Sequence, residues 1–235
     1  MADTILVPLE LPDPEPLSPV LVDDLSSLDV VVLGHYDLPE QTPVRDAREQ
    51  FGDAAQATLD EVAETFADAG ATVRTRLVFG KDRATTIERV AAEEECAAEL
   101  DPAPTERIER ILVPLPDVAE FDRLPAFVRL LSEDSTQEIT LFHVVEGEER
   151  RERGETVVAE TRERLVEDGF NAESVDTLVV EGDGHDEEIL RVAAEYDAVV
   201  MYEPESNVTD RVFGSLADRI ADETGDPVIV VNRDY

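Results

Sequence analysis

The feature that most constrains the fold is an apolar phrase that occurs twice. Ile-Leu-Val-Pro-Leu stands at Ile5–Leu9 and again at Ile111–Leu115. After each copy, stretches rich in Val, Ile and Leu alternate with amphipathic stretches of about ten residues or more. This alternation is typical of right-handed βαβ units, in which helices join parallel strands. The sequence therefore predicts an α/β fold of open, mostly parallel twisted sheets flanked by helices.

The two copies match most closely in their third helix. Arg89–Glu93 and Arg191–Glu195 carry the same five residues, Arg-Val-Ala-Ala-Glu. Carried forward without gaps, this register places Cys96–Leu100 opposite Ala198–Tyr202, as a fourth buried strand in each copy. Identity at this density, together with the repeated first strand, indicates two copies of one structural unit.

The copies differ in length. The second continues through a further helix and a last strand, Pro227–Val231, whereas the first runs directly into the next Ile-Leu-Val-Pro-Leu. We therefore predict a truncated domain over residues 1–104 and a complete domain over residues 105–235. After the first phrase we expect strands at 28–36 and 71–79 and helices at 45–69 and 85–95. After the second we expect strands at 138–145 and 175–181 and helices at 122–131, 155–168 and 185–195.

The charge of the chain is strongly negative. It has 57 acidic residues against 20 basic ones, a net charge of -37, and Lys81 is its single lysine. The acidic residues are spread along the chain, so we expect a halophilic protein whose self-repulsion is screened at molar salt, where the Debye length is about 3 Å. A specialised acidic binding surface is the alternative. The sequence has no basic patch, and this argues against binding nucleic acid.

The chain shows no targeting or membrane signal. No apolar run approaches the roughly 18 residues of a membrane span, and the first residues lack the basic region of a signal peptide. We therefore expect a cytoplasmic protein without membrane insertion. Cys96 is the only cysteine, which excludes an internal disulfide, and we expect it to be a small buried residue.

The order of elements, together with three local motifs, resembles the universal stress protein family. These motifs are the opening Ile-Leu-Val-Pro, the strand end Phe142–Val145, and the closing segment Val212–Val231 with Gly-Ser before its helix. The second copy resembles a complete family domain over about Glu109–Asn232, and the first a truncated one. The resemblance implies the strand order 3-2-1-4-5 for each sheet.

The resemblance also implies which residues an ATP-binding member of the family would need. Family members that bind ATP carry an aspartate just after the first strand, and here Glu10 and Pro116 occupy that position in the two copies. They also carry the pattern G-x2-G-x9-G-[S/T] after the fourth strand. In the second copy the first two glycines of that pattern are replaced by Met201 and Pro204, while Gly214 and Ser215 match it.

Glycine matters in such a loop because phosphate must approach backbone N–H groups closely, and proline removes a donor. Losing two charged hydrogen bonds of roughly 1.5 to 3 kcal/mol each lowers affinity on the order of a hundredfold or more. We therefore expect no cofactor, with ATP or AMP as the alternative. A residual nucleotide site would use Gly214 and Ser215 together with the turn at Gly182 and Asp183. The alternative is that these residues have only a structural role. Ser215 would then cap the helix that follows it, and Gly182 and Asp183 would form a tight turn into a helix with Asp183 or Asp186 near the N-cap.

The histidines do not form a catalytic or metal site by spacing. His185 lies in an acidic stretch, Glu181–Glu188, without an identifiable second ligand group, so we predict no metal. His35 and His143 end strands and are interpreted as satisfied histidines at the edge of the core. No serine or cysteine nucleophile has a partner at a recognisable spacing, so we predict no catalytic residues.

The last strand is the predicted interface. In the order 3-2-1-4-5 the fifth strand lies at a sheet edge, and an uncharged apolar edge invites pairing. Relatives commonly dimerise by pairing this strand antiparallel, so we expect a homodimer through Val228, Ile229, Val230 and Val231.

Taken together, the residues and the resemblance predict a non-enzymatic stress-response or regulatory protein that acts through association with as yet unidentified protein partners. One alternative is a family member that binds ATP or AMP with a modified loop at residues 203–211. A second is an enzyme related to the adenine-nucleotide α-hydrolases. That enzyme would need a glycine- and serine-rich phosphate loop after the first strand, and neither copy has one.

Overall fold

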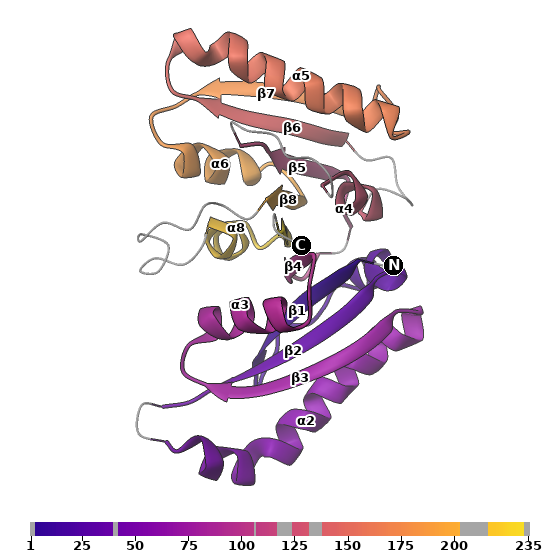
Figure 1. The fold of residues 1–235 in the computed structure, drawn as a ribbon, viewed down its shortest axis with the longest axis vertical. Coiled ribbons are helices and arrows are strands. Elements are labelled where there is room, and N and C mark those ends of the chain that lie inside the picture. Colours follow the sequence, from indigo (N-terminus) through magenta and orange to yellow (C-terminus); the bar gives the residue numbers. More distant parts are fainter. Residues whose placement is uncertain are drawn as a thin grey trace. The chain divides into compact units, whose positions relative to one another are not determined.

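The structure is a computed structural model that describes residues 3–39, 42–105, 107–116, 124–131, 138–202 and 216–232. The chain divides into two compact units, with the boundary between Pro104 and Thr105. Figure 1 shows that each unit consists of strands with helices packed on both sides. Among the described residues, no helix has the length and apolarity needed to cross a membrane.

Unit 1, which runs up to Pro104, contains four strands in the order β3-β2-β1-β4. Each strand pair in this unit is parallel. Counted within the unit, the order is 3-2-1-4. The strands are β1 (Thr4–Leu11), β2 (Asp29–Asp37), β3 (Thr72–Gly80) and β4 (Ala98–Asp101), and the helices are α1 (Pro19–Asp24), the 3-10 helix η1 (Leu25–Ser27), α2 (Val44–Ala69) and α3 (Arg83–Glu93).

The two faces of this sheet are covered by different helices. Successive strand residues point to opposite faces, so Val31 and Leu33 of β2 share one face. Both pack in a buried cluster with Ile87 of α3. On the other face, Tyr36 of β2 stacks on Phe51 of α2 with ring centroids 5.4 Å apart. Figure 1 shows α2 and α3 on opposite sides of β1, β2 and β3.

Helix ends in unit 1 follow local sequence signals. Gly70 ends α2 with φ of 110°, in the left-handed region that glycine adopts most easily. Asp82 caps the start of α3, because its carboxylate accepts hydrogen bonds from the Thr85 N–H at 3.0 Å and the Thr85 hydroxyl at 2.9 Å. These bonds hold the pKa of Asp82 below its usual value.

Unit 2, which begins at Thr105, contains five strands in the order β9-β8-β5-β6-β7. Its strand pairs are also parallel. Counted within the unit and read from β7, this is the expected order 3-2-1-4-5. The strands are β5 (Arg110–Pro114), β6 (Glu138–Val145), β7 (Val175–Glu181), β8 (Ala198–Tyr202) and β9 (Val228–Val231), and the helices are α4 (Leu124–Leu130), the 3-10 helix η2 (Glu148–Arg150), α5 (Arg151–Glu167), α6 (His185–Ala193) and α8 (Leu216–Thr224).

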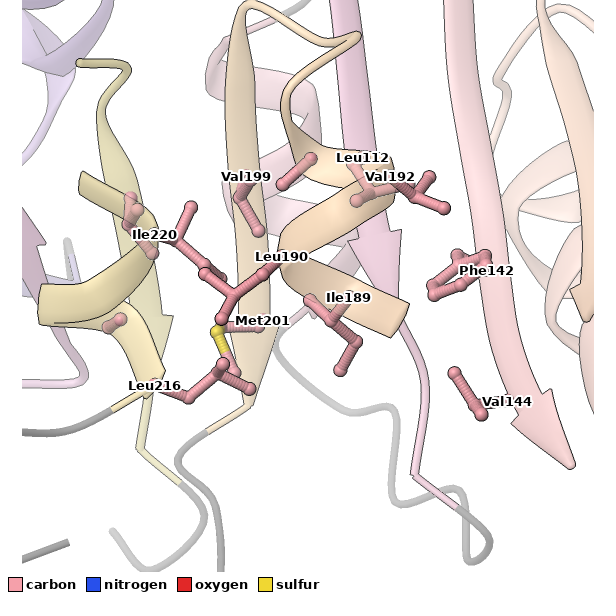
Figure 2. Packing of buried hydrophobic residues seen from close by; sticks show 13 residues of the cluster. Leu112, Phe142, Val144, Ile189, Leu190, Val192, Val199, Met201, Leu216 and Ile220 are labelled. Carbon is pink, nitrogen blue, oxygen red and sulfur yellow. The ribbon is translucent and has the colours of Figure 1, made fainter. Parts of the chain in front are cut away.

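The core of unit 2 lies between the strands and helices α6 and α8. Phe142 of β6 is completely buried there, together with Leu112 of β5 and Ile220 of α8. Figure 2 shows the side chains of this cluster meeting between the sheet and the two helices. Helix α5 packs on the other side of β6 and β7, as Figure 1 shows.

The fourth strand of unit 1 differs from the gapless register. That register placed Cys96 opposite Ala198, but in the structure Ala98 pairs with Ile5 just as Ala198 pairs with Ile111. The difference arises because α3 has 11 residues and α6 only nine, so the turn into the strand comes two residues later. Cys96 therefore precedes β4 instead of beginning it.

The prediction that Cys96 is buried is confirmed, since its side chain is completely buried. Burial, assisted by the carboxylates of Glu99 and Glu94, raises the pKa of the thiol to about 12. Because the thiolate is the reactive form, we expect Cys96 of the folded protein to react far more slowly with a disulfide reagent at pH 8 than Cys96 of the chain unfolded in guanidinium. Equal rates in the two states would show that the thiol is accessible.

Candidate functional site

Ligands of open parallel sheets bind outside the carboxyl ends of the strands, so these ends define the candidate site of unit 2. Strand β5 ends at Pro114 and is followed by Leu115 and Pro116. Strand β7 is followed by a short turn, Gly182–Gly184, that leads into α6. The segment after β8, residues 203–215, lies outside the described residues.

The turn after β7 is built around glycine. The Gly182 N–H donates a hydrogen bond to the Val145 carbonyl at 3.1 Å. A Cβ placed on Gly182 would lie 2.5 Å from the Cγ of Glu188, so a larger residue would displace that side chain. Asp183 is exposed. Gly182 and Asp183 both lie in the turn between β7 and α6.

The N-cap residue of α6 is Gly184, which provides no side-chain hydrogen bond. Asp183 directly precedes it and Asp186 lies in the first turn of the helix, so both lie near the N-cap, as predicted. Three acidic residues occupy the first turn of the helix, where negative charge complements the helix dipole, namely Asp186, Glu187 and Glu188. The carboxylate of Asp186 also lies 3.5 Å from the guanidinium of Arg219 on α8.

The glycine-loop positions are only partly described. Gly214, Ser215 and Pro204 lie outside the described residues, and the predictions for them stay predictions. Met201 is on β8 and only 4% exposed. Figure 2 shows its side chain beside Leu190 and Leu216 in the core of unit 2. The Met201 side chain thus contributes to packing, and the features that disfavour phosphate binding are Pro204 and the residues at the ends of the first strands.

The ends of the two first strands carry no aspartate. Glu10 is exposed near the end of β1, beside His35 of β2 in the parallel register. Pro116 is half-buried two residues after β5 and has neither a donor nor a charged group in its side chain. At the position where the resemblance implies an aspartate for ATP binding, unit 2 therefore has no carboxylate, and unit 1 has a glutamate, whose side chain is longer.

His143 is a satisfied core histidine, as predicted. It is buried, and its Nδ1 lies 2.9 Å from the Leu115 carbonyl oxygen. Gly154 of α5 faces it closely, since a Cβ at Gly154 would lie 2.9 Å from the His143 Cδ2. This histidine connects β6 to the end of β5 and to α5.

The corresponding prediction for His35 is wrong. His35 is only 1% exposed, yet neither ring nitrogen has a hydrogen-bond partner in the part of the chain that the structure describes. Burial lowers the pKa of the ring. The neighbouring charge of Asp37 acts to raise the pKa and that of Arg83 to lower it further. The spacing of residues along β2 indicated burial, but the absence of a partner depends on the turn that packs over the ring.

The acidic stretch around His185 does not gather metal ligands. The His185 Nδ1 lies 3.7 Å from a carboxylate oxygen of Asp186, and both side chains are largely exposed. Within the described ranges, no group of three or more His, Cys, Asp or Glu side chains could hold a metal ion.

Comparison with known families decides the assignment. The universal stress protein family model matches residues 108–232, more than half of the chain. The chain belongs to the universal stress protein family. The matched range covers unit 2 from the residues just before β5 to the end of β9, so this universal stress protein carries the family sheet in unit 2. The search of curated proteins gives no match.

Solved structures share the fold of this universal stress protein. A universal stress protein from Archaeoglobus fulgidus DSM 4304 has a TM-score of 0.65 at 15% identity, with 100% of both chains covered. A putative universal stress protein from Pseudomonas aeruginosa UCBPP-PA14 has a TM-score of 0.52 at 16% identity, covering 98% of this chain and 93% of that one. The cytoplasmic domain of a prokaryotic cation chloride cotransporter has a TM-score of 0.53 at 10% identity, covering 99% and 96%. At these identities the likeness concerns the fold.

Proposed function

We propose that this universal stress protein is a non-enzymatic stress-response or regulatory protein that acts through association with other proteins and does not bind ATP as its ATP-binding relatives do. The observation that carries the proposal is the pair of first-strand ends. Unit 2 has Pro116 and unit 1 has Glu10 at the place where those relatives have aspartate. A proline side chain cannot accept a hydrogen bond, so unit 2 lacks the carboxylate that such a site needs.

The charge of the protein supports the same proposal. A net charge of -37 repels a nucleotide triphosphate at low salt, and a helix N-terminus with three acidic residues is a poor phosphate site. We further propose that the protein works in the cytoplasm of a salt-adapted cell, where molar salt screens this repulsion.

Calorimetric titration with ATP and with AMP in molar KCl tests the proposal. We expect no saturable heat at micromolar ligand, and an ATP-binding family member in the same buffer is the positive control. Saturable binding at micromolar ligand would overturn the proposal and would favour a nucleotide site formed by the modified loop at residues 203–211. Turnover of ATP in the same samples would favour the α-hydrolase-like enzyme instead.

We propose that unit 1 is a truncated copy of unit 2. Pro8 pairs with Leu33 in unit 1 and Pro114 with Phe142 in unit 2, so the repeated phrase occupies the same position in each sheet. Among its described residues, unit 1 has four strands and no fifth one, whereas unit 2 has β9 as its fifth. These shared pairings support a common origin of the two units.

We also propose that the protein forms a homodimer through β9. Its four residues, Val228–Val231, are uncharged, and when the strands of unit 2 are counted by themselves β9 comes last, next to β8. Light scattering in molar KCl should give the mass of two chains. Deleting residues 228–235 should give a monomer or an aggregate, whereas deleting residues 233–235 alone should leave the dimer intact. A monomeric full-length chain, or a dimer that survives the longer deletion, would contradict this interface.

A further inference from the structure

His35 occupies an unusual position in the core of unit 1. It lies on the same face of β2 as Val31 and Leu33, which pack against α3. Its neighbours in the parallel register are Glu10 on β1 and Val78 on β3. The ring thus lies between its neighbours on two strands and the start of α3, and among the described residues neither nitrogen has a hydrogen-bond partner.

The turn into α3 covers this ring closely. A Cβ built on Gly80 would lie 3.3 Å from the His35 Nε2 and 3.8 Å from the Thr86 hydroxyl oxygen. The Nε of Arg83, the first residue of α3, is also buried and has no hydrogen-bond partner within the part of the chain that the structure describes. Two polar groups from different elements are therefore buried unsatisfied at the same end of the helix, which costs stability.

Charged groups on β1, on β2 and at the start of α3 act on the ring. Glu10 belongs to β1, Asp37 to β2, Asp82 caps α3, and Arg83 begins α3. The three carboxylates belong to exposed residues. A positively charged ring would be repelled by Arg83 in the buried site and attracted to the carboxylates at the surface.

We propose that His35 is an acid-sensitive switch that loosens the α3 side of unit 1 when its ring is protonated. The neutral ring stays packed beneath the first turn of α3. The protonated ring leaves this site for the carboxylates of Glu10, Asp37 and Asp82, and the first turn of α3 opens as the ring moves.

The pH range follows from the direction of the shift. The ring has a lowered pKa in the folded protein and the ordinary value of 6.5 once exposed. Stability from this group is therefore complete above about pH 6.5 and is lost as the pH falls toward the folded value, because the open state binds the proton more tightly. Between pH 7.5 and 5.5 this linkage raises the opening constant by up to about tenfold.

Unit 2 lacks the switch. Pro8 pairs with Leu33 and Pro114 with Phe142, so the residue corresponding to His35, two positions further along the strand, is Val144. Val144 packs in the core cluster of unit 2 with Ile189. The acid-dependent opening should therefore be confined to unit 1.

Hydrogen exchange of the full chain in molar KCl, corrected for the intrinsic effect of pH on exchange, tests the switch. The amides of β2, β3 and α3 should open up to about tenfold more often at pH 5.5 than at pH 7.5 in the natural protein. In His35→Val, which introduces the residue of unit 2, this increase should disappear. In His185→Gln, which changes an exposed histidine, it should remain. An unchanged increase in His35→Val, or none in the natural protein, would overturn the proposal.

A second measurement keeps the proposal testable even if His35→Val does not fold. NMR titration of the imidazole signals in the natural protein should show the His35 ring titrating below 6.5. In Asp37→Asn it should titrate lower still, because a carboxylate that favours the charged ring is removed. A His35 ring that titrates at or above 6.5, or that does not respond to Asp37→Asn, would overturn the switch.

Discussion

Phe142→Ala should lower the free energy of unfolding of unit 2 by about 3–5 kcal/mol. Phe142 is completely buried on β6, in the cluster that joins the sheet to α6 and α8. Figure 2 shows its ring on the side of the cluster next to Val144. Removing the ring deletes apolar contacts and leaves a cavity, because the neighbouring strands and helices cannot close around it.

This loss is measured by unfolding the protein in denaturant and monitoring the hydrogen exchange of the amides of unit 2. Phe142→Leu is the matched control, since it keeps an apolar side chain and should cost clearly less. A loss below about 1 kcal/mol in Phe142→Ala would mean that the core of unit 2 is not packed as described.

Gly154→Ala should destabilise unit 2 by roughly 1–3 kcal/mol, although alanine is the better helix former. Gly154 lies inside α5 against the sheet. An added Cβ would lie 2.7 Å from the Val145 Cγ1, 2.9 Å from the His143 Cδ2 and 3.2 Å from the Val179 Cγ1. These atoms belong to two strands, so the helix must move outward or the buried histidine must shift.

Gly52→Ala is the matched control for this change. Gly52 also lies inside a helix, α2, but a Cβ there would meet only the Arg48 Cγ, at 3.6 Å. This variant should be up to about 1 kcal/mol more stable than the natural protein, because alanine favours the helix. Thermal unfolding of both variants distinguishes the two effects. Stabilisation by both substitutions would show that α5 does not press on the sheet at Gly154.

Several regular elements could be predicted from the sequence, because their apolar residues recur over long stretches and some helices end at a glycine. The strand over residues 138–145 and the helix ended by Gly70 were placed within a residue or so. The position of β4 was not predictable, since the lengths of α3 and α6 differ by two residues and the local sequence does not show it.

The candidate site was less predictable than the fold. The glycine pattern aligned Met201 with the first glycine of a phosphate loop, whereas the repeat register placed it in a buried fourth strand, and its position in β8 and in the core confirms the strand. Both His35 and His143 were expected to have hydrogen-bond partners, but among the residues that the structure describes His143 lies against the Leu115 carbonyl whereas His35 has no partner. Whether a buried polar group finds a partner depends on contacts between distant segments, which strand periodicity does not reveal.

The nucleotide content of the purified protein tests the central claim most directly. The protein is isolated in molar KCl, denatured with acid, and its released small molecules are separated and identified by mass spectrometry. We expect no adenine nucleotide in stoichiometric amount, because the first-strand ends carry Glu10 and Pro116 instead of aspartate. A stoichiometric amount of ATP or AMP released from the chain would contradict the account of a universal stress protein that works without the family's nucleotide.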